Sequence, residues 1–106
     1  MGEVIHLLTP KASPVTLEEL VERAHQLAKK SENVYLDHPH AQIRMKERSV
    51  SIRQIHDVLR HGKGVDGPKL DKYGDWRIKL KRFSAGRSVE VVVVVKDGHL
   101  EVVTVI

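Results

Sequence analysis

Ten residues, numbers 40–49, combine side chains that could handle a phosphate group. Wound as an α-helix, they place His40, Arg44 and Arg48 at intervals of four residues, so that the three side chains share one stripe, with Glu47 beside it. Guanidinium groups bind phosphate through paired hydrogen bonds, and an imidazole exchanges protons near neutral pH. The stripe is therefore a candidate site for phosphate chemistry.

The structural alternative is that the two arginines only clamp the helix to a neighbouring sheet. Three carboxylates could pair with them, namely Glu47, Glu90 and Glu101. Arg48 is expected closest to the apolar edge formed by Ala41 and Met45, so it should border the core, whereas Arg44 should lie farther away. Arg44 is thus the stronger candidate for chemistry, and Arg48 for a scaffold role.

A basic strand is the second feature that could bind an anion. Apolar and basic residues alternate from Trp76 onward, which predicts a strand with Arg77, Lys79 and Lys81 on one face and the apolar residues on the other. If the helix packs beside this strand, Lys79 could join the stripe and stabilise charge on a phosphate. The predicted catalytic residues are then His40, Arg44, Arg48 and Lys79. The predicted RNA-binding residues are Tyr73, Arg77, Lys81 and Arg82, with Tyr73 able to stack on a base.

Length, composition and charge restrict the classes of function. The 106 residues suffice for one domain with a single core, and the absence of cysteine excludes disulfides, Cys-ligated zinc and thiol catalysis. The histidine pairs 38/40 and 56/61 do not have zinc-site spacing, so we expect neither metal nor cofactor. No apolar run is long enough for a membrane span and no signal peptide is evident, so we expect a soluble, cytoplasmic protein. Residues 1–37 carry 4 Lys/Arg against 6 Asp/Glu, while the rest is basic, which favours an anionic partner.

The pattern along the chain predicts helices first and an antiparallel sheet after them, an α+β fold. We expect helices at 17–30, 39–48 and 52–61, the second with Asp37 as a possible N-cap. Strands are expected from Trp76, at 88–96 and at 99–106, with the valine-rich strand central and Asp97-Gly98 as a hairpin turn. Glu3 to Leu8 is either an edge strand or a loose arm. The predicted organisation is an N-terminal arm and linker (1–15), an extension helix (16–37) and a main domain (38–106).

The helix sequence HAQIRMKER, the Trp76-Arg77 strand, the valine strand and the Val103-Thr104-Val105 ending resemble a small bacterial domain family of unknown function over residues 38–106. That family in turn resembles the RelE/BrnT-like toxins of toxin–antitoxin pairs, which are α+β ribonucleases with helices packed on a small antiparallel sheet. The resemblance implies an mRNA-cleaving toxin neutralised by an antitoxin protein, possibly of the MqsA/YgiT zinc-finger type. It transfers a functional role to the residues of the helix motif and, less specifically, to Thr104.

We therefore expect a metal-independent endoribonuclease toxin in which the RNA 2′-hydroxyl attacks the adjacent phosphodiester. His40 would be the general acid or base, and Arg44, Arg48 and Lys79 would stabilise the phosphate. The first alternative is a non-catalytic module whose basic face binds nucleic acid or an acidic antitoxin segment. The second is an inhibitor or interaction domain that adds a partner strand to the edge of the valine-rich sheet.

Overall fold

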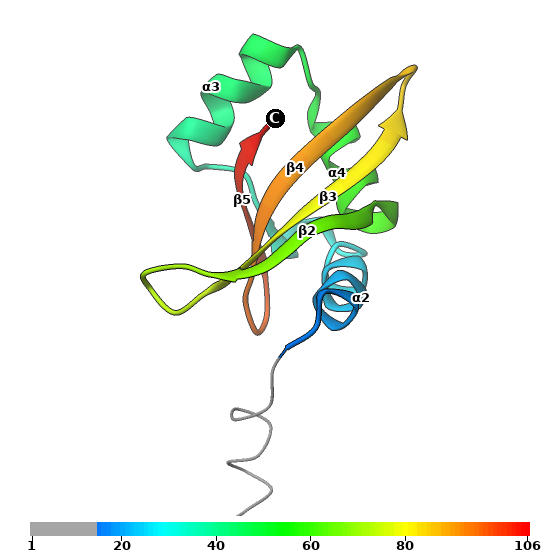
Figure 1. The fold of residues 1–106 in the computed structure, drawn as a ribbon. Helices are drawn as coiled ribbons and strands as arrows, with labels where there is room; N and C mark the ends of the chain where they lie inside the picture. The colour runs from blue at the N-terminus through cyan, green and yellow to red at the C-terminus, as the bar shows by residue number, and fades with distance from the viewer. Residues whose placement is uncertain (1–14) are drawn as a thin grey trace, which may run out of the picture.

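The computed structural model describes residues 15–106, which form helices around a five-stranded sheet and confirm the α+β class (Figure 1). The helices are α2 (Leu17–Leu27), the short 3-10 helix η1 (Ser31–Asn33), α3 (Pro39–Arg48) and α4 (Ile52–His61). The strands are β1 (Val34–Tyr35), β2 (Lys63–Leu70), β3 (Trp76–Ser84), β4 (Arg87–Val95) and β5 (Leu100–Val105). The arm or strand expected at Glu3 to Leu8 lies outside the described residues.

The strands are arranged in the order β1-β5-β4-β3-β2, with antiparallel neighbours except for the parallel pair β1 and β5. The valine-rich β4 is central, as predicted, and pairs with β3 and β5 along its length. Its turn into β5 contains Asp97 and Gly98, so the two strands run antiparallel as a two-residue connection requires. The edge available to a partner strand is therefore β2, together with the outer side of β5 beyond β1.

The helices α2 and α4 cover one face of the sheet and enclose the core. Alternation along β3 and β4 sends Ile78, Leu80, Val91 and Val93 to this face, where each is at most 2% exposed. Both helices begin with the capping box that their sequences predict, at Thr16 and Ser51. The larger buried residues of the helices are Leu20, Ile55, Val58 and Leu59.

The third helix, α3, packs against β5 instead, through the buried residues Ala41 and Met45. Its bounds match the prediction, but its N-cap does not. His38, not Asp37, caps the helix, because the imidazole of His38 accepts a hydrogen bond from the backbone N–H of His40. The helix ends at Arg48, and the left-handed backbone of the following residue, Ser49 (φ 55°), turns the chain toward α4.

The α2 region packs into the same core as the helices and strands that follow it. Leu20, Ala24 and Ala28 of the α2 region are 0% exposed. A Cβ on Gly64 of β2 would lie 2.7 Å from Val21 Cγ2, so the glycine lets α2 approach the sheet closely. The helix ends at Leu27, three residues before the predicted end. No helix within residues 15–106 combines the length and apolar character needed to cross a bilayer.

Candidate functional site

The face of the sheet opposite α2 and α4 carries two of the predicted RNA-binding residues, Arg77 and Lys81, and we call it the open face. Strand register aligns its side chains in rows: Lys63 with Lys81 and Glu90, Asp66 with Lys79 and Val92, and Lys69 with Arg77 and Val94. The basic residues come from β2 and β3, and β4 contributes the apolar strip. Alternation therefore places five cations and two carboxylates on this area of the open face.

The lysines of β3 share a single carboxylate. Lys79 Nζ lies 4.0 Å from Glu90 Oε1 and Lys81 Nζ lies 3.8 Å from Glu90 Oε2, both longer than a hydrogen bond. Lys63 stands directly opposite Lys81 in the register and makes no ion pair within residues 15–106. Like charges directly opposite each other destabilise a sheet. Asp66 stands opposite Lys79 in the register, so these three lysines have two neighbouring carboxylates, Glu90 and Asp66, and an excess of positive charge remains.

The two other cations of the open face have closer partners. Lys69 Nζ lies 3.1 Å from Asp66 Oδ2, and Arg77 Nε lies 3.2 Å from Asp71 Oδ2. Hydrogen bonding to Lys69 lowers the pKa of Asp66. A hydrogen bond from the backbone N–H of Asp75, with further bonds from Tyr73 and Arg77, lowers the pKa of Asp71. Both carboxylates are therefore charged at neutral pH and fix the orientation of the basic side chains.

A cavity of about 240 Å³ opens on this face between β2 and β4. Lys69, Arg77 and Lys79 line it together with Asp66, and Val92 and Ile106 give it an apolar floor. Cationic groups around an apolar floor suit a ligand with a negative backbone and flat apolar parts, as a nucleotide has. The residues of the cavity could hold an anion. Among residues 15–106, no group of three or more His, Asp or Glu is placed to bind a metal.

Two of the predicted RNA-binding residues lie away from this cavity. Tyr73 belongs to the β2–β3 turn and is 74% exposed, at the end of the open face. Arg82 points to the opposite face, where its Nε lies 3.0 Å from Asp57 Oδ1 of α4. Side chains alternate between the two faces of a strand, so Arg82 lies on the same face as Ile78 and Leu80. Arg82 therefore joins sheet to helix and is not part of the basic open face.

The helix stripe is arranged differently from the prediction. Arg44, expected farther from the core, is the partly buried arginine: its Nε donates to the Val105 carbonyl at 3.2 Å and its Nη1 lies 3.4 Å from Glu47 Oε1. Arg48, expected at the core, is exposed and makes no hydrogen bond or ion pair within the described part of the chain. The reason is that β5 ends beside the middle of α3. Arg44 thus clamps α3 to β5, as the structural alternative stated.

The predicted catalytic residues are not gathered at one point. Arg44 contacts β5, whereas Lys79 lies on β3, with β4 between them. Two strand spacings separate these strands by about 10 Å. His40 is exposed, and its imidazole makes no hydrogen bond with any residue from 15 to 106. The structure therefore brings Arg77, Lys79 and Lys81 together on one face, and sets His40, Arg44 and Arg48 along the neighbouring helix.

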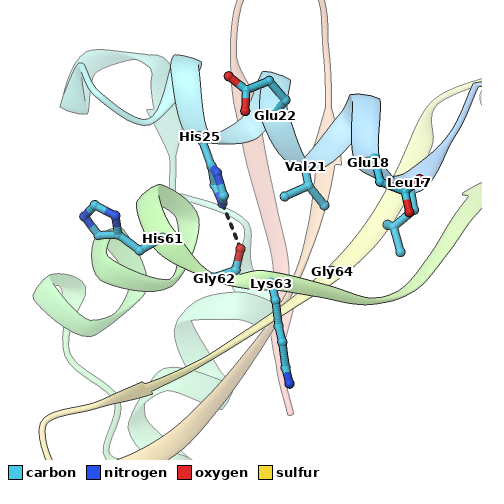
Figure 2. Close-up of a pocket in the computed structure, with 9 residues that line it drawn as sticks. All are labelled: Leu17, Glu18, Val21, Glu22, His25, His61, Gly62, Lys63 and Gly64. Carbon is cyan, nitrogen blue, oxygen red and sulfur yellow. Dashed lines mark hydrogen bonds between the residues drawn. The ribbon is translucent and has the colours of Figure 1, made fainter.

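Two histidines for which the sequence suggests no partner are fixed by tertiary contacts. His25 Nε2 lies 2.8 Å from the Gly62 carbonyl oxygen, beside a cavity of about 360 Å³ between α2 and the start of β2 (Figure 2). His99 Nε2 lies 2.9 Å from Glu101 Oε2, and its ring centroid lies 4.6 Å from that of Tyr35. In the sequence, the hydrogen bond between His99 and Glu101 is indicated only by their spacing, because residues i and i+2 of a strand share one face.

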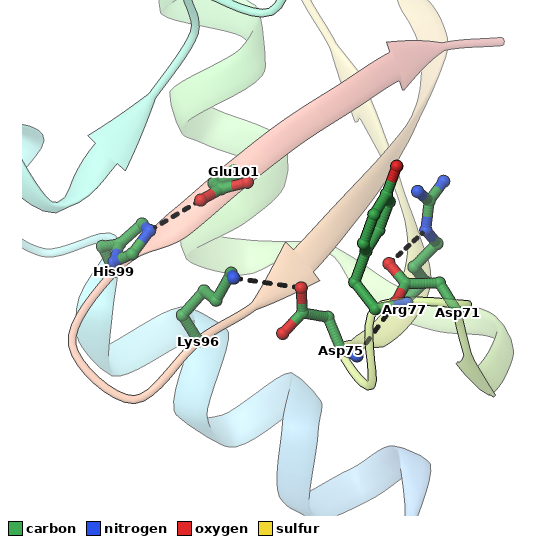
Figure 3. A network of polar contacts seen from close by, with 7 residues as sticks. Asp71, Asp75, Arg77, Lys96, His99 and Glu101 are labelled. Atoms are coloured by element: carbon green, nitrogen blue, oxygen red, sulfur yellow. Dashed lines mark hydrogen bonds and ion pairs between the residues drawn. The ribbon is translucent and has the colours of Figure 1, made fainter.

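His99 and Glu101 extend a network of charged groups across the end of the open face (Figure 3). Lys96 Nζ lies 3.0 Å from Asp75 Oδ2. This hydrogen bond raises the pKa of Lys96, and the nearby charge of Glu101 acts in the same direction. The network therefore links the β2–β3 turn with the β4–β5 turn.

Comparison with known proteins gives one match. Residues 38–106 match the family model described as "Domain of unknown function (DUF4258)". No curated protein and no solved structure matches the chain. The matched segment begins just before α3 and includes α4 and strands β2 to β5, so it contains the open face without α2 and β1.

Proposed function

We propose that this member of the DUF4258 family, whose description states no activity, binds RNA on its open face. The observation that carries this proposal is the excess of cations on this area of the open face, where three carboxylates, Asp66, Asp71 and Glu90, are the ion-pair partners among five basic residues, Lys63, Lys69, Arg77, Lys79 and Lys81. Excess cations on an open sheet attract a polyanion, and phosphate contacts supply most of the affinity for a nucleic acid. The apolar residues of the cavity, Val92 and Ile106, would contact ribose and base.

Substitution of the two β3 lysines tests this proposal. The change Lys79→Gln with Lys81→Gln removes two phosphate contacts, which should weaken binding of a single-stranded RNA about tenfold at 0.15 M salt. Fluorescence anisotropy of a labelled oligonucleotide measures this affinity. The matched control is Lys29→Gln with Lys30→Gln, which removes the same charge from exposed positions just after α2. Equal affinities of the two double variants would contradict the proposal.

The finer proposal is that this RNA-binding protein is the endoribonuclease toxin of a toxin–antitoxin pair, of the RelE/BrnT-like kind. Two observations are compatible with cleavage: the exposed imidazole of His40 and the adjacent Arg44, whose Nη2 makes no bond within residues 15–106. An antitoxin with an acidic segment would neutralise it by covering the open face, in competition with RNA. Expression in bacteria tests this finer proposal, since the parent chain should arrest growth, and the Lys79→Gln, Lys81→Gln double variant, which binds RNA more weakly, should arrest it less.

A further inference from the structure

We propose that His99, oriented by Glu101, is the general base of an RNA-cleaving site on the open face. This inference rests on the RNA binding proposed above. It differs from the assignment of His40, because His99 projects from the sheet surface that would carry the RNA. Four observations support it: the hydrogen bond to Glu101, the tilted packing of the ring against Tyr35, the partial exposure of the ring and its position beside the basic rows.

The hydrogen bond fixes which ring nitrogen is free. His99 Nε2 lies 2.9 Å from Glu101 Oε2, so an Nε2–H donated to the carboxylate leaves Nδ1 with a lone pair. Nδ1 has no hydrogen-bond partner within residues 15–106. A base oriented by a carboxylate is the arrangement that activates hydroxyl nucleophiles in many enzymes. Glu101 is therefore a positioning residue for the imidazole.

Tyr35 holds the ring from a third element of the fold. The centroids of the Tyr35 and His99 rings lie 4.6 Å apart with an angle of 54° between their planes. Tyr35 pairs in register with Glu101, so β1 places the phenol ring on the open face beside the dyad. The side chains of His99 and Glu101 are still 32% and 43% exposed, which leaves the imidazole within reach of a ligand.

The register of the sheet relates this dyad to the basic rows. Arg77 pairs with Val94, and Val94 pairs with Glu101, so the three side chains form one row across β3, β4 and β5. The row spans about 10 Å, which is the scale of one to two nucleotides of an extended strand. Lys96 lies next to the dyad at the β4–β5 turn, where its backbone N–H donates to the His99 carbonyl at 2.9 Å. An RNA crossing the row would meet Arg77 on one side of Val94, Glu101 with its bonded imidazole on the other side, and Lys96 beside them.

The step that this arrangement supports is transfer of the phosphodiester to the 2′-oxygen. Nδ1 of His99 takes the proton of the 2′-hydroxyl as the 2′-oxygen forms a bond to phosphorus. The bond from phosphorus to the 5′-oxygen breaks, and that oxygen takes a proton from water. The hydroxide left behind is neutralised by the imidazolium proton. The products are a 2′,3′-cyclic phosphate and a 5′-hydroxyl end, with no oxidant, reductant or covalent enzyme intermediate.

Cleavage of a labelled single-stranded RNA by the full chain tests the inference. The change His99→Ala should lower the cleavage rate at least 100-fold, within the range for loss of a general base, and should leave RNA affinity within twofold of the parent. Added imidazole should restore part of the activity of His99→Ala. Glu101→Gln should lower the rate about tenfold, because the amide accepts a hydrogen bond without the charge. His61→Ala, at an exposed position at the end of α4, is the matched control and should cleave at the parental rate.

The possible results separate this inference from the proposed function. Parental cleavage rates in both His99→Ala and His99→Asn, or loss of cleavage in His40→Ala alone, would overturn the role of His99 and leave RNA binding intact. Binding of RNA by the parent without any cleavage would also overturn it. If His99→Ala does not fold, His99→Asn, which keeps a donor for Glu101, provides the comparison. Failure of the parent to bind RNA at all would reject the proposed function itself.

Discussion

Replacement of Arg44 by Gln should destabilise the protein, because the side chain clamps α3 to the end of β5. Its Nε–H donates to the Val105 carbonyl at 3.2 Å, and a hydrogen bond from a charged donor contributes about 1.5–3 kcal/mol. The ion pair with Glu47 adds less than about 1 kcal/mol, since the two side chains are 28% and 54% exposed. With the exposure of Arg44 taken into account, we expect a loss of about 1.5–2 kcal/mol in the free energy of unfolding.

Urea unfolding followed by circular dichroism measures this loss, and thermal melting should show a decrease of about 6–15 °C for a domain of this size. Arg48→Gln is the matched control on the same helix. Its side chain is exposed and makes no bond within residues 15–106, so its cost should stay below about 0.5 kcal/mol. A larger loss of stability in Arg48→Gln than in Arg44→Gln would refute the assignment of the clamp. Arg44→Gln with full stability and lost activity would instead restore Arg44 as a phosphate ligand.

Three further changes test other parts of the structure. Gly64→Ala should cost about 1–3 kcal/mol in urea unfolding, because the new Cβ would lie 2.7 Å from Val21 Cγ2; an unchanged midpoint would contradict this close packing. Glu90→Gln should strengthen RNA binding in an anisotropy titration, since it removes the carboxylate that Lys79 and Lys81 share, and weaker binding would argue against the open face. Burial, with a smaller effect of Arg60, lowers the pKa of His56 below its usual value of 6.5. The unfolded chain therefore takes up this proton first, so stability should fall as the pH drops below about 6.5, and His56→Gln should flatten that dependence.

Local signals predicted the elements in which periodicity and caps agree. The bounds of α3 and α4 follow from Pro39 at the first turn, from the pair Ser51 and Gln54, and from the helical spacing of apolar residues. Strand alternation likewise predicted β3, β4 and the turn into β5. By contrast, β1 has only two residues, and its parallel pairing with β5 depends on contacts distant in sequence. Glycine, proline and register shifts concealed the alternation of β2.

The candidate site was predictable in part. Strand alternation correctly placed Arg77, Lys79 and Lys81 on one face, and the same rule places Arg82 on the other face. Which of the helix arginines contacts the sheet depends on where β5 ends, and no local pattern carries that information. The dyad of His99 and Glu101 likewise needed the tertiary structure, since Tyr35, which packs against the His99 ring, lies 64 residues before His99 in the chain.

The dependence of RNA affinity on salt tests the central claim most directly. If Lys63, Lys69, Arg77, Lys79 and Lys81 each contact a phosphate of single-stranded RNA, the logarithm of affinity should fall with the logarithm of salt with a slope of about −3.5. Between 50 and 200 mM salt, the parent should then lose about 100-fold in affinity, and the Lys79→Gln, Lys81→Gln double variant only about 20-fold. Identical slopes for the parent and this variant, or an affinity that does not change with salt concentration, would contradict RNA binding on the open face.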